Sequence, residues 1–119
     1  MYKRSNSVFK ARLTLRRDRL KATEACHAAT LQFEGRTEKD INSGECFEWA
    51  TIVFDLLEGS KIAGHNINGC GHSWIEYRGL CWDAETPQGV RGWLKLPFWQ
   101  RLKKEAGAKE FNRAVRKLA

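Results

Sequence analysis

The sequence predicts a single α+β domain in which one helix packs on a small antiparallel sheet. A helix is expected over residues 44–57, because apolar residues recur there at three- and four-residue steps and form one stripe. A hairpin is expected over residues 72–84, where two apolar-rich segments flank Arg78-Gly79, a pair suited to a tight turn. The stripe consists of Phe47, Ala50, Val53, Phe54 and Leu57.

The rest of the chain is organised around these two elements. Residues 9–15 alternate between apolar and polar, which predicts a strand or the start of a helix that runs through Leu20. Residues 18–31 have helical composition. Residues 40–43 are expected to form a loop, with Asn42 and Glu45 as a loose capping box, and the glycine-rich residues 64–71 to form another. From Lys95 onward the pattern predicts basic C-terminal helices.

Length and composition exclude several classes of protein. A chain of 119 residues, 42% hydrophobic and 29% charged, has ordinary globular composition and needs neither metal nor disulfide to fold. The longest apolar stretch, residues 49–57, contains Asp55 and is too short to cross a membrane. No apolar run follows the basic start, so we expect no secretory signal, a cytoplasmic location and four reduced cysteines.

The charge is divided into three blocks. Residues 1–21 carry eight basic and one acidic side chain, residues 22–90 carry four and eleven, and residues 91–119 carry nine and two. We therefore divide the domain, residues 1–119, into a motif-bearing core (42–90) and two basic flanks (1–21 and 91–119). Such flanks either fold back on the acidic middle or bind an acidic partner such as nucleic acid.

Three residues have the chemistry of a cysteine nucleophile. Cys46 stands at the start of the expected helix, where unpaired amides and the helix dipole lower a thiol pKa. His72 opens the hairpin and can exchange a proton with the thiol, and Asp83 on the returning strand can orient the imidazole. The alternative role for Cys46 is that of a small buried apolar residue.

The hairpin register places the third residue near the second. With Arg78-Gly79 as the turn, Trp74 faces Asp83 and His72 faces Glu85. Asp83 is then the diagonal neighbour of His72, with Cβ atoms roughly 6–8 Å apart. Glu85 lies directly opposite His72, so it is the alternative third member.

These residues resemble a known superfamily. Gly44-Glu45-Cys46, followed by His72-Ser73-Trp74-Ile75-Glu76 and then Trp82-Asp83, is similar to the transglutaminase-like branch of papain-type thiol enzymes. The similarity covers about residues 42–90. It implies a papain/transglutaminase-like core in which the cysteine helix packs on the sheet. It also implies acyl chemistry on amides, as a cysteine protease, transglutaminase or deamidase, with Cys46 as the nucleophile, His72 as the acid–base and Asp83 as its orienting partner.

The surroundings of this triad supply further candidates. Beside the Cys46 amide, Gln32 and Asn42 are candidate oxyanion donors, and Trp74 is a candidate shield over the thiolate. Four acidic residues are expected around the cleft and favour a basic or amine-bearing protein or peptide substrate. They are Glu45, Glu48, Glu76 and Glu85.

Two alternatives involve no thiol catalysis. A zinc site could use Cys70, His72 and Cys81 with His65 or Cys46, but the spacing does not fit, and we expect neither metal nor cofactor. The second alternative is a binding module for nucleic acid or protein, in which the basic flanks and their interleaved aromatics, Trp93, Phe98 and Trp99, contact the partner.

Overall fold

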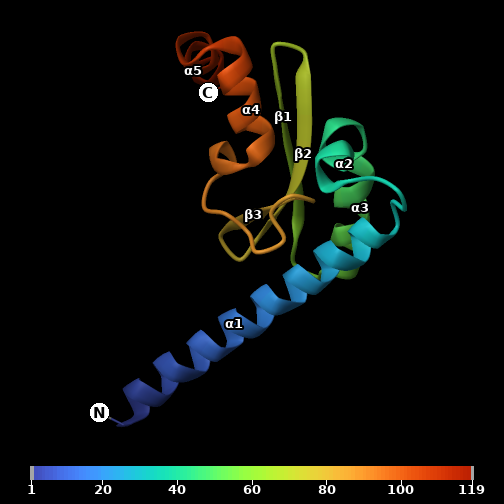
Figure 1. Cartoon of the computed structure of the whole chain (residues 1–119). Helices are drawn as coiled ribbons and strands as arrows, with labels where there is room; N and C mark the ends of the chain where they lie inside the picture. Colours follow the sequence, from blue (N-terminus) through green and yellow to red (C-terminus); the bar gives the residue numbers. More distant parts are fainter. Residues whose placement is uncertain (1, 119) are drawn as a thin grey trace.

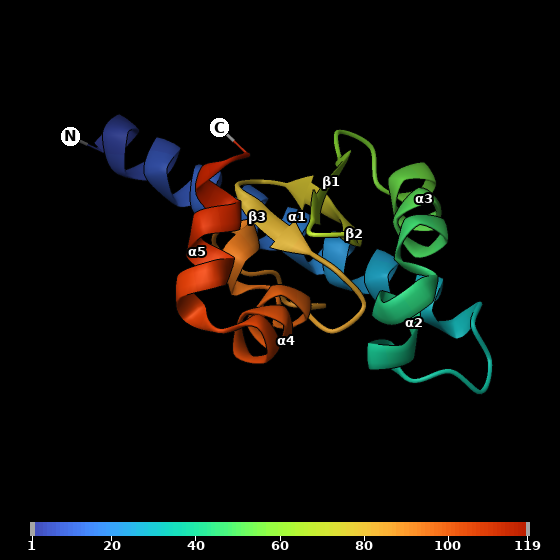
Figure 2. The same cartoon turned by 90° about the horizontal axis from the view of Figure 1, so that it is seen from above.

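The computed structural model describes residues 2–118, and its five α-helices and three-stranded antiparallel sheet confirm the α+β class (Figure 1). The sheet has the order β1-β2-β3, so β2 is its central strand. Viewed from above, α2 and α3 lie on one side of the sheet and α4 and α5 on the other (Figure 2). The elements are α1 (Tyr2–Leu31), α2 (Glu38–Gly44), α3 (Cys46–Leu56), β1 (Lys61–Ile67), β2 (Cys70–Tyr77), β3 (Leu80–Trp82), the 3-10 helix η1 (Trp93–Lys95), α4 (Pro97–Ala106) and α5 (Ala108–Arg116).

Each face of the sheet contributes to a separate apolar core, because side chains alternate between the two faces along a strand. On one face Ile75 packs with Val53 of α3 and with small residues of α1. On the other face Trp74 packs with Trp99 of α4 and Phe111 of α5. The basic C-terminal segment therefore folds back on the domain and buries Trp99 and Phe111 against the sheet.

The β2–β3 hairpin forms as predicted. Arg78 and Gly79 have φ values of 51° and 75°, as a two-residue turn of this kind requires. Tyr77 faces Leu80 and Ile75 faces Trp82, which confirms the register. The strand β3 ends at Trp82, however, so residues 83 and 84 leave the sheet instead of extending it.

The prediction of a glycine-rich loop over residues 64–71 is wrong. This segment is part of a second hairpin, in which the whole of β1 pairs with residues 70–76 of β2 around Asn68-Gly69. Both turn residues have positive φ, 52° and 85°, and the Gly69 amide donates to Asn66 Oδ1 at 2.9 Å. Asn-Gly is a strong signal for such a turn, and the glycines on either side of it obscured that signal.

The N-terminal segment is a helix, so the strand alternative for residues 9–15 is wrong. Phe9 and Leu13 are exposed, which shows that their alternation with polar residues does not mark the buried face of a sheet. Only the second half of α1 enters the core, through Ala22, Cys26 and Ala29. None of the helices among residues 2–118 combines the length and the apolar character that a membrane span requires.

The predicted loop over residues 40–43 is also wrong, because these residues lie in α2. The capping box is formed by Thr37 and Asp40 and not by Asn42 and Glu45: the Asp40 amide donates to Thr37 Oγ1 at 3.1 Å, and the Thr37 amide donates back to the Asp40 carboxylate. Glu45 then separates α2 from α3, so α3 begins two residues later than predicted, at Cys46.

The apolar stripe of α3 is partly confirmed. Ala50, Val53 and Leu57 are buried, but Phe47 and Phe54 are exposed. Trp49, which lies outside the predicted stripe, is fully buried, and its indole N–H donates to Thr30 Oγ1 of α1 at 3.0 Å. Because the large Trp49 side chain packs toward α1, the buried face of α3 is turned toward α1 relative to the predicted stripe.

Candidate active site

Cys46 occupies the first position of α3, as the sequence predicts. Its thiol is half-buried and accepts a hydrogen bond from the backbone amide of Ser73, with a nitrogen–sulfur distance of 3.4 Å. The Phe47 amide, in the first turn of α3, also points to the sulfur and lowers the pKa of the thiol. Amides of the first turn have no partner within a helix and are free to stabilise negative charge here.

The premature end of β3 provides the space for this contact. In the two-residue hairpin, Tyr77 and Ile75 direct their backbone groups toward β3. Ser73 lies two residues before Ile75 and directs its backbone amide to the same side of β2. Because β3 has already ended at Trp82, no residue of β3 faces the Ser73 amide. The Cys46 sulfur takes the place that a strand would otherwise fill, and this joins α3 to the centre of the sheet.

Asp83 binds His72 at the same edge. The two side chains are buried, and the His72 Nε2 atom lies 2.9 Å from Asp83 Oδ2. The other carboxylate oxygen, Oδ1, accepts hydrogen bonds from the Glu85 amide at 3.0 Å and from the Thr86 hydroxyl at 2.9 Å. Thr86 Oγ1 also accepts from the Asp83 amide, so the turn after β3 holds the carboxylate in one orientation.

Cys46 and His72 shift each other's pKa in opposite directions. Burial by itself raises the pKa of Cys46, but the interaction with His72 and the Ser73 amide outweigh it, and the pKa is lowered. Burial by itself lowers the pKa of His72, but the bonds to Asp83 and Cys46 outweigh it, and the pKa is raised. These shifts favour a thiolate beside an imidazolium.

The imidazole nitrogen that remains for the thiol is Nδ1, because Nε2 is used by Asp83. Nδ1 is buried and makes no hydrogen bond of standard geometry within residues 2–118. Its contact with Cys46 is therefore looser than the contact between His72 and Asp83. Hydrogen bonds of reacting groups are often long or poorly aligned without substrate.

Aromatic side chains cover the imidazole on the α4 side. The Phe98 ring stacks on His72 with a centroid distance of 4.4 Å and an interplanar angle of 15°. Trp74 lies 6.0 Å from the imidazole and stacks on Trp93 at 5.8 Å. Trp74 thus packs beside His72, and Phe98, which the sequence assigned to partner binding, belongs to the site.

Glu85, the alternative third member, does not contact His72. Its carboxylate forms a bidentate ion pair with Arg101, at 2.7 and 2.9 Å, and accepts a hydrogen bond from Asn42 at 2.9 Å. These bonds lower the pKa of Glu85, with the Arg101 contact as the largest cause. The network ties α2 and α4 to the turn that carries Asp83.

Neither of the two amide candidates for oxyanion binding forms a side-chain hydrogen bond with Cys46 within the described residues. Asn42 is buried, and its Nδ2 is engaged by Glu85. Gln32 is exposed in the turn that follows α1, and no contact joins its side chain to Cys46 within the described part of the chain. The backbone amide of Cys46 remains the candidate donor, because it begins α3.

The acidic surroundings are weaker than the sequence indicated. Glu45 pairs with Arg36 at 2.7 Å, and Glu85 pairs with Arg101. Glu48 and Glu76 remain exposed. Two of the four negative charges are therefore compensated by arginines, which reduces the electrostatic argument for a basic substrate.

The other cysteines lie apart from a metal-binding arrangement. Cys70 is exposed at the start of β2, while Cys81 is buried beside Trp74. Cys26 is buried in α1, and burial together with Asp83 raises its pKa to about 12. Within residues 2–118 no three histidine, cysteine or acidic side chains are placed to hold a metal ion.

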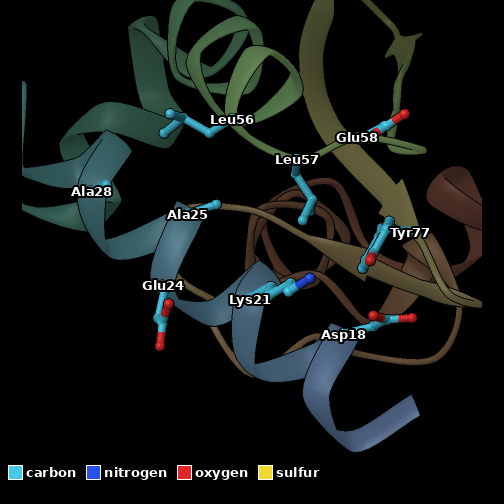
Figure 3. A pocket seen from close by; sticks show the side chains of 9 residues that line it. All are labelled: Asp18, Lys21, Glu24, Ala25, Ala28, Leu56, Leu57, Glu58 and Tyr77. Atoms are coloured by element: carbon cyan, nitrogen blue, oxygen red, sulfur yellow. The ribbon is translucent and has the colours of Figure 1, made fainter. Parts of the chain in front are cut away.

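A large cavity lies elsewhere on the molecule. It has a volume of about 610 Å³ and is bounded by α1, the end of α3 and Tyr77 of β2 (Figure 3). Asp18, Lys21 and Glu58 are among its lining residues, but Cys46 and His72 are not. The cavity is therefore separate from the candidate site, which is identified by the geometry of its side chains.

Comparison with known proteins identifies no relative: no family model, curated protein or solved structure matches the chain.

Proposed function

We propose that the protein is a thiol-dependent hydrolase or acyl transferase of the transglutaminase-like type, acting on amide bonds through an acyl intermediate on Cys46. The observation that carries this proposal is the chain of contacts from the Cys46 thiol to His72 and from His72 to the buried Asp83 carboxylate. The amides at the start of α3 and in β2 support it, because they favour a thiolate.

The reaction starts from the thiolate–imidazolium pair. The Cys46 thiolate adds to the carbonyl carbon of an amide, and the negative charge moves to the carbonyl oxygen. The Cys46 amide is the nearest candidate donor for this oxyanion. His72 then gives its proton to the departing amine, the carbon–nitrogen bond breaks, and an acyl thioester with neutral His72 remains.

The acyl group is released when a second nucleophile attacks. His72 takes the proton of an incoming water or amine, which adds to the thioester and expels the Cys46 thiolate. Asp83 holds the ring so that Nε2–H points to its carboxylate and Nδ1 faces the thiol. Attack by water gives proteolysis or deamidation, and attack by an amine gives transamidation of a protein or peptide substrate.

The test uses two variants, Cys46→Ala and His72→Ala, assayed on a panel of peptides and proteins for cleavage, ammonia release and amine incorporation. We expect each variant to lose activity by several orders of magnitude, as triad variants do. Cys70→Ser is the matched control, because it removes an exposed thiol outside the site and should retain full activity. Wild-type activity in Cys46→Ala contradicts the proposal, as does an inactive, folded wild type whose Cys46 resists alkylation.

A further inference from the structure

The first half of α1 extends away from the rest of the domain (Figures 1 and 2). Contact with the core begins at Ala22, so about twenty residues of helix precede it. Residues 1–21 carry eight of the basic side chains and a single acidic one. This half of α1 is therefore a basic surface that the domain does not need for its core.

Arginines gather on one face of this segment. Arg12, Arg16 and Arg19 lie at steps of four and three residues and line a cavity of about 480 Å³ where α1 passes Gln88. Phe9, three residues before Arg12, has the same helical phase and is 62% exposed. Arginine is suited to phosphate contact, and an exposed aromatic ring can stack on a base.

No acidic side chain neutralises these arginines within the described residues. The one carboxylate of the segment, Asp18, points to the other side of α1 and pairs with Arg78 at 3.3 Å. Arg12, Arg16 and Arg19 have no ion pair in the part of the chain that the structure describes, and Arg19 Nε is buried without any hydrogen-bond partner. The positive charge of these three guanidinium groups is therefore not compensated by any carboxylate of the described residues.

The extent of the surface favours a polymer over a small anion. From Phe9 to Arg19 the helix rises about 15 Å, which is the length of about four phosphates along one nucleic-acid strand. The cavity runs along the same stretch of α1, from Arg12 to Thr23. A single phosphate or carboxylate would leave most of the basic side chains without a partner.

We propose that this face of α1, defined by Phe9, Arg12, Arg16 and Arg19, binds the phosphate backbone of single-stranded nucleic acid. The site is independent of the proposed chemistry at Cys46. It also differs from the sequence-based alternative that used both flanks, because Trp93, Phe98 and Trp99 pack against the sheet and against His72. In the C-terminal flank Trp99 is buried and Trp93 and Phe98 are partly buried, whereas Phe9 of α1 is exposed.

The experiment measures binding of the full chain to a fluorescent single-stranded oligonucleotide of about twenty nucleotides between 50 and 200 mM salt. We expect the triple variant Arg12→Gln, Arg16→Gln, Arg19→Gln to lose about tenfold or more in affinity. Loss of three phosphate contacts should also reduce the slope of log K against log salt by about 2. The double variant Arg12→Gln, Arg16→Gln changes only exposed residues and should show about two thirds of this reduction.

The matched control removes the same charge from the other flank. Lys104→Gln, Lys109→Gln, Lys117→Gln changes three exposed lysines and should leave the salt slope nearly unchanged. Equal weakening by both triple variants would mean that net charge alone drives binding and would overturn the proposal. No binding by the wild type at 50 mM salt, or tighter binding to polyglutamate than to the oligonucleotide, would overturn it as well. Cys46→Ala should bind like the wild type, which separates this site from the proposed enzyme activity.

Discussion

Replacing Asp83 by asparagine tests the bond that orients His72. The carboxylate is fully buried and receives three contacts, from His72 Nε2, the Glu85 amide and the Thr86 hydroxyl, all at 2.9–3.0 Å. Asparagine has the same shape, so the substitution leaves no cavity. Its oxygen can keep the two contacts of the turn, but its NH₂ group then faces Nε2.

In Asp83→Asn the expected loss of stability comes from one of these three contacts, the one between residue 83 and His72 Nε2. A hydrogen bond to a charged group contributes about 1.5–3 kcal/mol, so Asp83→Asn should lower the free energy of unfolding by about that amount at neutral pH. Asp83→Ala removes all three contacts and leaves buried polar groups unpaired, for which we expect about 3–5 kcal/mol. Urea unfolding followed by tryptophan fluorescence measures both changes.

The expected loss of reactivity follows from the histidine tautomer. Opposite an asparagine NH₂ group, Nε2 must accept a hydrogen bond, so the proton moves to Nδ1 and His72 can no longer take a proton from Cys46. The proposed amide chemistry should fall by about 10⁴, the loss that this substitution causes in a Ser-His-Asp triad. Alkylation of Cys46 at pH 6–7 should fall by about tenfold or more, which corresponds to one unit of thiol pKa.

The alkylation assay compares proteins that all carry Cys70→Ser, because the exposed Cys70 thiol would otherwise react with the reagent as well. Cys26 does not interfere, since its pKa is raised to about 12. Glu85→Gln is the matched control: it neutralises the neighbouring carboxylate, which binds Arg101 and not His72, and should leave alkylation unchanged. Wild-type alkylation in Asp83→Asn, or a larger loss in Glu85→Gln, would refute the assignment of Asp83.

Two further predictions concern pH. His72→Ala should move the alkylation profile of Cys46 to higher pH, because the histidine that lowers the thiol pKa is lost while burial still raises it; a profile that does not move would show that the two side chains are uncoupled. Arg101→Met should lower the free energy of unfolding by about 1 kcal/mol at pH 7. This difference from the wild type should disappear as the pH falls through the lowered pKa of Glu85, because protonation of Glu85 removes the charge that Arg101 binds in the wild type. Urea midpoints between pH 2.5 and 7 measure this difference, and a constant deficit across that range would contradict the role of the ion pair.

Local sequence was enough to predict the β2–β3 hairpin and the position of Cys46. A two-residue turn depends on its own residues, and Arg78-Gly79 between apolar segments therefore determines the register. The start of α3 was nearly as accessible, since helical periodicity continues up to Cys46. The Asn68-Gly69 turn had an equally local signal, but the surrounding glycines led to the prediction of a loop.

The choice between Asp83 and Glu85 depended on the tertiary structure. An extended β3 would have placed Glu85 opposite His72, yet the strand ends at Trp82 and the chain turns through Thr86. Arg101, sixteen residues further along the chain, binds Glu85 and removes it from the site. Contacts between distant segments have no local sequence signal. The hairpin register alone could therefore not show which of the two carboxylates binds the imidazole of His72.

The same distinction applies to the whole molecule. The sequence by itself determined the α+β class, the order of cysteine, histidine and aspartate, and the basic flanks, because these depend on residue type and short-range periodicity. Only the tertiary structure decided that Trp99 and Phe111 are buried against the sheet, while Arg12, Arg16 and Arg19 of α1 form no ion pair within the described residues. Which apolar surface is buried depends on how the helices pack together on the sheet, and this packing brings together residues that no local pattern relates.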